Sequence, residues 1–230
     1  MKKPVIGIAA KHDPAFDTGR ADTFIRDEVK QAVFDNGGIA VGLLPPEAGV
    51  HYCDDAWENE FTPQEEENLY AQIGLCDGII LQGGYEKDYY ENLIARYCYE
   101  RDIPILGICA GQNNLVRALG GTTYRIPNPE QHSRPDEKYV HNIQIKKGSR
   151  FHKIVGTDEM KVNSRHIRTI GQCPLLEKAA LCEDGYPDVV EAKEKRFYIG
   201  VRFHPESLYL EDPYMNRIFQ AFLAECQKKV

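Results

Sequence analysis

Short apolar runs alternate with amphipathic segments along the first half of the chain. Residues 4–10, 39–44, 78–81 and 103–108 form apolar runs with the length and composition of buried strands. Between the first two runs, residues 22–36 carry apolar side chains at helical spacing. Strands that alternate with helices predict a parallel sheet covered by helices on both faces.

Local signals set the limits of the predicted helices. Gly37 and Gly38 are expected to end the first one. Thr62 and Glu65 form a capping box with Pro63 at the first helical position, so a helix is predicted from there to about Ile73. Two further helices are predicted over residues 87–101 and 213–227.

The pattern changes after Gly121. Residues 122–150 are polar, contain prolines and lack helical periodicity, which predicts extended structure and loops near the mouth of a site. Four later strands are predicted over residues 159–162, 179–183, 189–193 and 197–203. With 42% hydrophobic content and no internal repeat or linker, residues 1–230 are expected to form one domain.

Charge and composition exclude several classes of protein. A formal charge of −7 and a pI near 5.6 argue against a nucleic-acid partner. No segment approaches the roughly 18 consecutive apolar residues of a membrane span, and the first apolar run is too short for a signal peptide, so the expected compartment is the cytoplasm. Seven scattered cysteines without C-x-x-C spacing favour free thiols over a metal site or disulfides.

One of these cysteines has the context of a nucleophile. Gly107, Cys109 and Gly111 form a G-x-C-x-G motif directly after the apolar run that ends at Ile108. Flanking glycines permit the tight turn of a nucleophile elbow, which leads from a strand into a helix. The helix N-terminus would favour the thiolate of Cys109. Taken alone, a cysteine in such a turn is inert about as often as it is reactive.

A base and its orienting group occur near the end of the chain. His204 follows the apolar run 197–203 and precedes Pro205 and Glu206. Cysteine, histidine and carboxylate are the three members of an acyl-transfer triad. A lone histidine before proline is usually part of a surface turn, so the prediction of a Cys109–His204–Glu206 triad depends on the conjunction of the three.

Several segments together resemble the class I glutamine amidotransferase superfamily, and within it the peptidase C26 or γ-glutamyl-γ-aminobutyrate hydrolase family. The segments that carry this resemblance are Val5-Ile-Gly-Ile8, Asp77-Gly-Ile-Ile-Leu-Gln-Gly-Gly84, Pro104-Ile-Leu-Gly-Ile-Cys-Ala-Gly111, Ala118-Leu-Gly-Gly-Thr122, Val162-Asn-Ser-Arg-His166 and Gly200-Val-Arg-Phe-His-Pro-Glu206.

The resemblance implies an α/β fold of the flavodoxin-like three-layer type, with a central, mostly parallel sheet. It also implies cysteine-dependent hydrolysis of a small γ-glutamyl amide, without metal or organic cofactor. The implied partner is a small-molecule substrate, and a homodimer is compatible with the family although no surface pattern demands it.

Catalysis requires two donors for an oxyanion. The backbone N–H of Ala110, directly after the nucleophile, is the natural first donor. Gly83 and Gly84 follow the 78–81 run; in isolation such a pair more often marks a simple turn. The resemblance assigns the second donor to this loop.

The substrate-binding residues are less well marked. Relatives carry Cys-Arg-Gly-Met-Gln at the elbow, whereas this chain has Ala110 in place of the arginine, with Gln112 and Asn113 further on. Either amide could bind the glutamyl group or face solvent. By resemblance, Ser164, Arg165 and His166 lie beside the glutamyl site, although an arginine in a polar loop is most often solvated. Arg168 is a further candidate for a carboxylate partner.

The loop after Gly84 also departs from the family pattern. It contains Tyr85, Tyr89 and Tyr90 among acidic residues, and these could line a pocket for a cationic or aromatic leaving group. The start of an amphipathic helix is the simpler interpretation.

Three classes of function remain open. They are a stand-alone hydrolase of γ-glutamyl amides, a glutaminase subunit that delivers ammonia to a separate synthase, and a non-catalytic member that keeps the fold. The joint presence of Cys109, His204 and Glu206 counts against the third.

Overall fold

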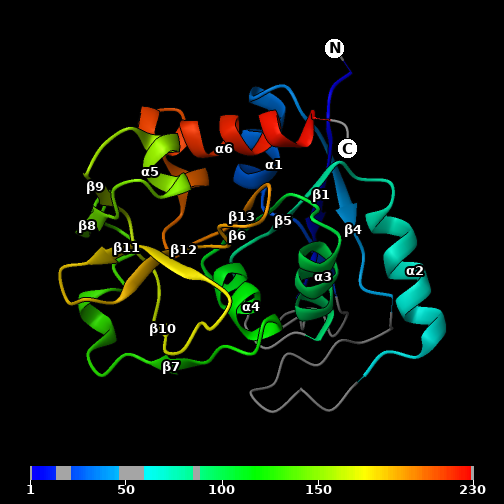
Figure 1. Ribbon diagram of the computed structural model, residues 1–230, viewed down its shortest axis with the longest axis horizontal. Coiled ribbons are helices and arrows are strands. Elements are labelled where there is room, and N and C mark those ends of the chain that lie inside the picture. Colours follow the sequence, from blue (N-terminus) through cyan, green and yellow to red (C-terminus); the bar gives the residue numbers. More distant parts are fainter. Residues whose placement is uncertain (1, 14–21, 47–59, 85–88, 229–230) are drawn as a thin grey trace.

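A mixed nine-stranded sheet forms the centre of the molecule, in the order β4-β1-β5-β6-β13-β12-β11-β8-β9 (Figure 1). The computed structural model describes residues 2–13, 22–46, 60–84 and 89–228. The first five strands of this order run parallel to one another: β4 (Ile39–Leu43), β1 (Val5–Ala9), β5 (Gly78–Leu81), β6 (Ile105–Ile108) and β13 (Tyr198–Val201).

The register of three central strands places the site. Gly107 of β6 pairs with Leu81 of β5 on one side and with Gly200 of β13 on the other. Because these strands are parallel, the residues that follow them emerge at the same edge of the sheet. Gly83, Cys109 and the segment leading to His204 are therefore neighbours.

The other half of the sheet is antiparallel. It consists of β12 (Pro187–Glu191), β11 (Glu177–Cys182), β8 (His141–Ile145) and β9 (Glu159–Val162). The start of β12, the end of β11, the start of β8 and the end of β9 consequently lie at the same edge as the end of β13. This edge thus brings residues of the second half of the chain toward the site.

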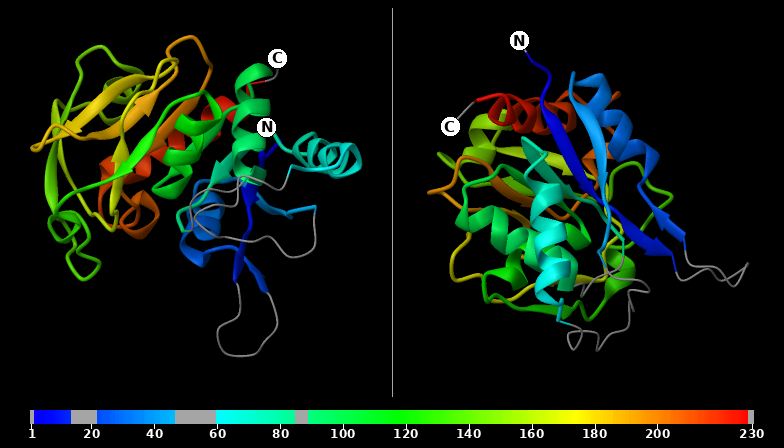
Figure 2. Two further views of the ribbon diagram at one scale, coloured as in Figure 1. Left: turned by 90° about the horizontal axis from the view of Figure 1, so that it is seen from below. Right: turned by 90° about the vertical axis from the view of Figure 1, so that its right-hand side faces the viewer.

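Helices cover both faces of the sheet, and each face has its own apolar core (Figures 1 and 2). The helices of one layer are α1 (Asp27–Asp35), α5 (Arg150–Val155) and α6 (Pro213–Cys226), and those of the other are α2 (Pro63–Ile73), α3 (Tyr89–Glu100) and α4 (Ala110–Ala118). The predicted three-layer α/β fold is confirmed.

Most of the predicted elements are present with small shifts at their ends. Thr62 caps α2 with both hydrogen bonds of the capping box, as predicted. The prediction of one helix over residues 22–36 is partly wrong, because β3 (Asp22–Phe24) pairs with β2 (Lys11–Asp13) and the helix begins only at Asp27. Long-range pairing overrides the local periodicity here. The predicted start of the 87–101 helix lies outside the described residues.

Short elements complete the structure. The region 122–150 is extended and looped, as predicted, with β7 (Thr123–Arg125), the 3₁₀ turn η2 (Pro129–Gln131) and β8. Sequence patterns gave no indication of α5 or of β10 (Arg168–Ile170), which pairs with β7. A second 3₁₀ turn, η3 (Pro205–Ser207), follows His204.

Candidate functional site

Cys109 is the residue between β6 and α4, and its backbone adopts an unfavourable conformation. Its φ of 52° and ψ of −106° are rare for a residue with a side chain. Close contacts explain the flanking glycines: a Cβ on Gly107 would lie 2.8 Å from the carbonyl oxygen of Gly111, and one on Gly111 would collide with the carbonyl oxygen of Leu81. The turn has the geometry of a nucleophile elbow.

His204 lies beside this elbow and is held by a carboxylate. Its Nδ1 is 2.7 Å from Oε1 of Glu206, and both side chains are buried. Burial would lower the pKa of His204, but the charges of Glu206 and Cys109 outweigh it and raise the pKa to about 10. The imidazole is thereby stabilised as a cation next to the sulfur. Cys109, His204 and Glu206 are thus brought together in one place.

The other described cysteines have no comparable surroundings. Burial raises the pKa of Cys76 and of Cys182 to about 11, and it also raises the pKa of Cys98, Cys173 and Cys226. All described cysteines are free thiols, and Cys53 lies outside the described residues. A raised pKa keeps a thiol protonated and unreactive at neutral pH.

Gly83 lies close to the side chains of both His204 and Cys109. A Cβ on Gly83 would lie 3.0 Å from Cε1 of His204 and 3.3 Å from Cβ of Cys109. Gly84 has a φ of +137°, which favours glycine. The N–H of Ala110, at the first position of α4, has no partner within that helix by its position. Gly83 and the start of α4 thus lie on either side of Cys109.

Gln82 fixes the start of this segment. Its buried amide donates to the carbonyl oxygens of Ala9, at 2.8 Å, and Phe24, at 3.2 Å, and accepts from the N–H of Arg26 at 2.9 Å. The loop is therefore attached to the ends of β1 and β3 and to the start of α1. Sequence reasoning gave Gln82 no role.

The side-chain amides of Gln112 and Asn113 form hydrogen bonds with different parts of the structure. Gln112 is fully buried, and its Nε2 donates to the carbonyl oxygens of Asp188 and Gly200, each at 3.1 Å. Its amide nitrogen thus ties α4 to β12 and β13. Asn113 accepts a 2.6 Å hydrogen bond from Nη1 of the buried Arg202. Arg202 precedes His204 by two residues, so this pair lies next to the candidate triad.

The 163–168 segment divides between buried and exposed residues. Ser164 is buried and its Oγ lies 2.9 Å from Nδ1 of His166, which is also buried. Arg165 is exposed, and Arg168 donates to the carbonyl oxygen of Thr123 at 3.5 Å. Of the residues expected beside the glutamyl group, Ser164 and His166 therefore face the interior and Arg165 faces solvent.

His166 belongs to a cluster of three histidines that sequence reasoning did not find. Its ring centroid is 5.1 Å from that of His132 and 6.2 Å from that of His141. Aspartates hold the other two rings: Nε2 of His132 is 3.0 Å from Asp184, and Nε2 of His141 is 2.6 Å from Asp188. The antiparallel half of the sheet creates this proximity, which no spacing along the chain reveals.

Burial and positive charge determine the protonation state within this cluster. Burial, the guanidinium of Arg202 and the neighbouring histidines all lower the pKa of His166 far below its usual range, so His166 is neutral. Among the described residues, no group of three or more histidine, cysteine or acidic side chains has the arrangement of a metal site.

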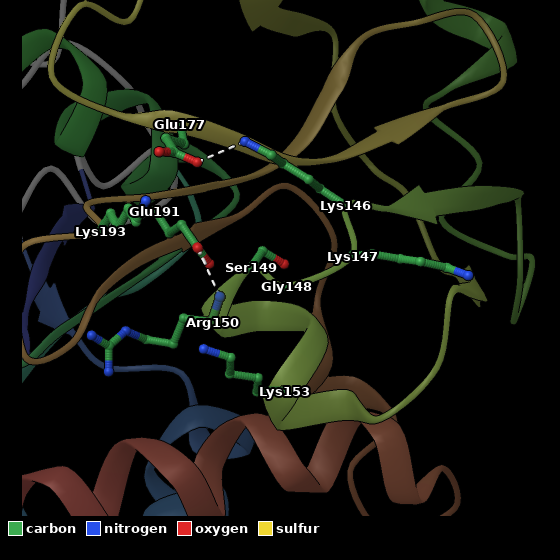
Figure 3. Close-up of a pocket in the computed structure, with 9 residues that line it drawn as sticks. All are labelled: Lys146, Lys147, Gly148, Ser149, Arg150, Lys153, Glu177, Glu191 and Lys193. Atoms are coloured by element: carbon green, nitrogen blue, oxygen red, sulfur yellow. Dashed lines mark hydrogen bonds and ion pairs between the residues drawn. The ribbon is translucent and has the colours of Figure 1, made fainter.

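A hollow of about 350 Å³ lies apart from the candidate triad, around the start of α5 (Figure 3). Lys146 binds Glu177 at 2.8 Å, and Glu191 accepts from the backbone N–H groups of Arg150 and Phe151. Four further cationic side chains line the hollow: Lys147, Arg150, Lys153 and Lys193. None of the predicted site residues lines it.

The expectation for the tyrosines after Gly84 can be compared with the structure only in part. Tyr85 and the rest of 85–88 lie outside the described residues, while Tyr89 and Tyr90 begin α3, as the simpler interpretation predicted.

No helix in the described part of the chain has the length and apolar content needed to span a membrane.

The chain is similar to known proteins in sequence and in fold. The chain is 25% identical over 250 residues to γ-glutamyl-γ-aminobutyrate hydrolase of Escherichia coli O157:H7, covering 100% of this chain and 96% of that relative. Its fold matches the glutaminase domain of Trypanosoma brucei CTPS, solved with bound acivicin, with a TM-score of 0.70, 18% identity and coverage of 99% and 95%. A glutamine amidotransferase from Thermotoga maritima matches with a TM-score of 0.64, 15% identity and coverage of 99% and 100%.

The family model of Peptidase C26 matches residues 61–206, a segment that contains Gly83, Cys109, His204 and Glu206. This match covers more than half of the chain, and the chain therefore belongs to the Peptidase C26 family.

Proposed function

We propose that this protein is a cysteine-dependent hydrolase that cleaves the γ-glutamyl amide bond of a small γ-glutamyl amine. γ-Glutamyl-γ-aminobutyrate and a γ-glutamyl polyamine product are representative substrates. The observation that carries the proposal is the arrangement of Cys109, His204 and Glu206 at one elbow, with the pKa of His204 raised to about 10. Full-length similarity to a γ-glutamyl-γ-aminobutyrate hydrolase supports the substrate class.

In the first half of the reaction, the thiolate of Cys109 attacks the δ-carbonyl carbon of the γ-glutamyl amide. The carbonyl π electrons move to oxygen, and the N–H groups of Ala110 and of the Gly83–Gly84 segment stabilise the resulting oxyanion. As the C–N bond breaks, His204 transfers its proton to the departing amine. The products of this step are a γ-glutamyl thioester and a free amine.

In the second half, neutral His204 removes a proton from water, whose oxygen attacks the thioester carbon. A second oxyanion forms at the same position, the C–S bond breaks and glutamate leaves. The thiolate of Cys109 and the imidazolium of His204 are restored. Glu206 holds the imidazole orientation throughout and stabilises its charge, as the carboxylate does in other triads.

A glutaminase subunit that delivers ammonia to a separate synthase is the second candidate. The similarity in fold to the glutaminase domain of a CTPS favours it, because that domain is part of a larger protein. The chemistry at Cys109 would be the same, with glutamine as substrate and ammonia as leaving group. The two candidates differ in substrate preference and in dependence on a partner.

Glutamate release by the purified protein alone separates these functions. The substrates are glutamine and a panel of γ-glutamyl amines that includes γ-glutamyl-γ-aminobutyrate, with Cys109→Ala as the control. We expect turnover of a γ-glutamyl amine well above that of glutamine, and its loss in Cys109→Ala. Activity on glutamine that appears only with an added synthase would support the second candidate. No cysteine-dependent turnover under either condition would contradict both.

A further inference from the structure

A buried ion pair lies next to the candidate site and has no role in the mechanism above. Nζ of Lys11 in β2 is 2.5 Å from Oε1 of Glu91 in α3, and both side chains are fully buried. Removing two charges from water is expensive, and an apolar pair of similar volume is often equally stable or more stable. Stability alone is therefore a weak reason for this pair.

The location of the pair connects it to two parts of the site. The aliphatic part of Lys11 lies under Gly84, because a Cβ on that glycine would be 3.8–3.9 Å from three carbons of the lysine. The other oxygen of Glu91 accepts a short hydrogen bond from Nδ2 of Asn114 in α4. Since α4 begins directly after Cys109, the pair joins the Gly83–Gly84 segment to the helix that presents the nucleophile.

The pair complements the attachment made by Gln82. Gln82 fixes the start of the glycine segment to β1, β3 and α1, while Lys11 supports Gly84 from below. The segment is thus restrained both at its start, through Gln82, and at Gly84, through Lys11. Oxyanion stabilisation depends on such fixed donors, and small displacements weaken it.

We propose that Lys11 and Glu91 are positioning residues that hold the Gly83–Gly84 segment against the nucleophile helix in the geometry required for oxyanion stabilisation. The inference rests on the proposed cysteine chemistry. Because the two charges nearly cancel, their effect on the site is geometric. Loss of the pair should weaken binding of the tetrahedral intermediate and leave substrate binding and the Cys109–His204–Glu206 contacts unchanged.

The test compares Lys11→Met, Glu91→Gln and the double variant Lys11→Met/Glu91→Met in the full chain, with the exposed Lys30 of the Lys30–Asp27 pair changed to Met as the control. Hydrolysis is followed with the best γ-glutamyl amine and with 4-nitrophenyl acetate. The ester requires the thiolate and the oxyanion donors but no glutamyl recognition. If the wild-type protein cleaves the ester but no γ-glutamyl amine, the proposed substrate class is rejected. The effect of the variants on ester cleavage then still tests the positioning role.

We expect kcat to fall about 10- to 100-fold in Lys11→Met and several-fold in Glu91→Gln, with KM changed less than about threefold, as for loss of an interaction made only in the transition state. The rate of Cys109 alkylation by iodoacetamide should match that of the wild-type protein. The double variant should regain stability, because no unpaired charge remains buried, yet keep the low kcat. Wild-type kcat in the double variant or in Glu91→Gln would overturn the proposal.

Discussion

Asn163 holds the backbone of His204 through two buried hydrogen bonds. The N–H of His204 donates to Oδ1 of Asn163 at 2.8 Å, and Nδ2 of Asn163 donates to the carbonyl oxygen of His204 at 2.9 Å. One asparagine at the end of β9 thus satisfies both backbone polar groups of the proposed general base. The side chain of Glu206 then fixes only the rotation of the imidazole ring.

Replacing Asn163 with alanine should therefore affect both stability and catalysis. The N–H of His204 would lose its partner, and its carbonyl oxygen would keep only the 3.3 Å bond from the N–H of Ser207. The free energy of unfolding should fall by about 1–3 kcal/mol. Displacement of His204 should lower kcat by about tenfold or more. Urea unfolding and steady-state kinetics measure the two effects. Asn163→Asp keeps the acceptor for the N–H but places a carboxylate oxygen against the carbonyl oxygen of His204, so both quantities should fall in this variant too. Unchanged values in both variants would contradict the assigned role.

The raised pKa of His204 predicts a pH dependence of stability. A histidine whose pKa is about 10 in the folded state, against 6.5 without perturbation, binds its proton more tightly when folded. Its stabilising contribution is complete below pH 6.5 and is lost as the pH rises to about 10. As the pH rises from 6.5 to about 10, the wild-type protein should therefore lose stability relative to His204→Gln.

Urea unfolding of both proteins at pH 6, 7, 8, 9 and 10 measures this difference. Groups that do not interact with His204 also titrate in this range, but they cancel to first order when the two proteins are compared at each pH. Cys109 is coupled to His204 and does not cancel, so a second background without it is needed. The double variant Cys109→Ala/Glu206→Gln removes the two charges that raise the pKa. In that background burial still lowers the pKa of the imidazole, so the His204→Gln substitution should produce a difference that is flat from pH 8 to pH 10. A flat difference in the wild-type background would show that the imidazole is not stabilised as a cation.

Gly83 should not tolerate a side chain, because the added Cβ would meet both reactive residues. The contact of 3.0 Å with Cε1 of His204 and 3.3 Å with Cβ of Cys109 would force them apart. We expect Gly83→Ala to lower kcat by about 10²-fold, in the range found for loss of an oxyanion donor. Gly74→Ala is a suitable control, since its Cβ would meet only ordinary contacts of 3.4 Å. Equal kcat in the two variants would exclude close packing at Gly83.

Local patterns were sufficient to predict the parallel half of the fold and the elbow. The strands β1, β5, β6 and β13 are continuous apolar runs because both of their faces are buried, and Thr62 and Pro63 mark the start of α2. Cys109 and His204 could be identified because each follows such a run directly. The structure brings them together with Glu206 through the parallel pairing of β6 and β13.

Long-range contacts could not be predicted in this way. Lys11 and Glu91 are separated by 80 positions, and nothing in the surroundings of either residue in the sequence indicates a buried charge. The cluster of His132, His141 and His166 depends on the antiparallel half of the sheet, whose strand order does not follow the sequence order. Periodicity identifies which residues are buried but not which of them meet.

Gln112 shows the same limit: its position in the sequence does not reveal which groups its side chain contacts. A glutamine near the nucleophile was a reasonable candidate for substrate binding, but its Nε2 donates to two backbone carbonyls, and its Cγ would lie only 2.6 Å from a Cβ on Gly200. Gln112→Met should therefore leave the carbonyls of Asp188 and Gly200 without this donor. We expect the free energy of unfolding to fall by about 1–3 kcal/mol and KM to stay within about twofold.

The neighbouring Asn113 provides the matched comparison. Its Oδ1 accepts from Arg202 beside the candidate triad, so Asn113→Leu should change KM or kcat more than Gln112→Met does at a similar loss of stability. Chemical unfolding and steady-state kinetics with one γ-glutamyl amine measure both quantities for both variants. A large increase in KM in Gln112→Met, without loss of stability, would return Gln112 to the substrate site and contradict the role that its hydrogen bonds indicate.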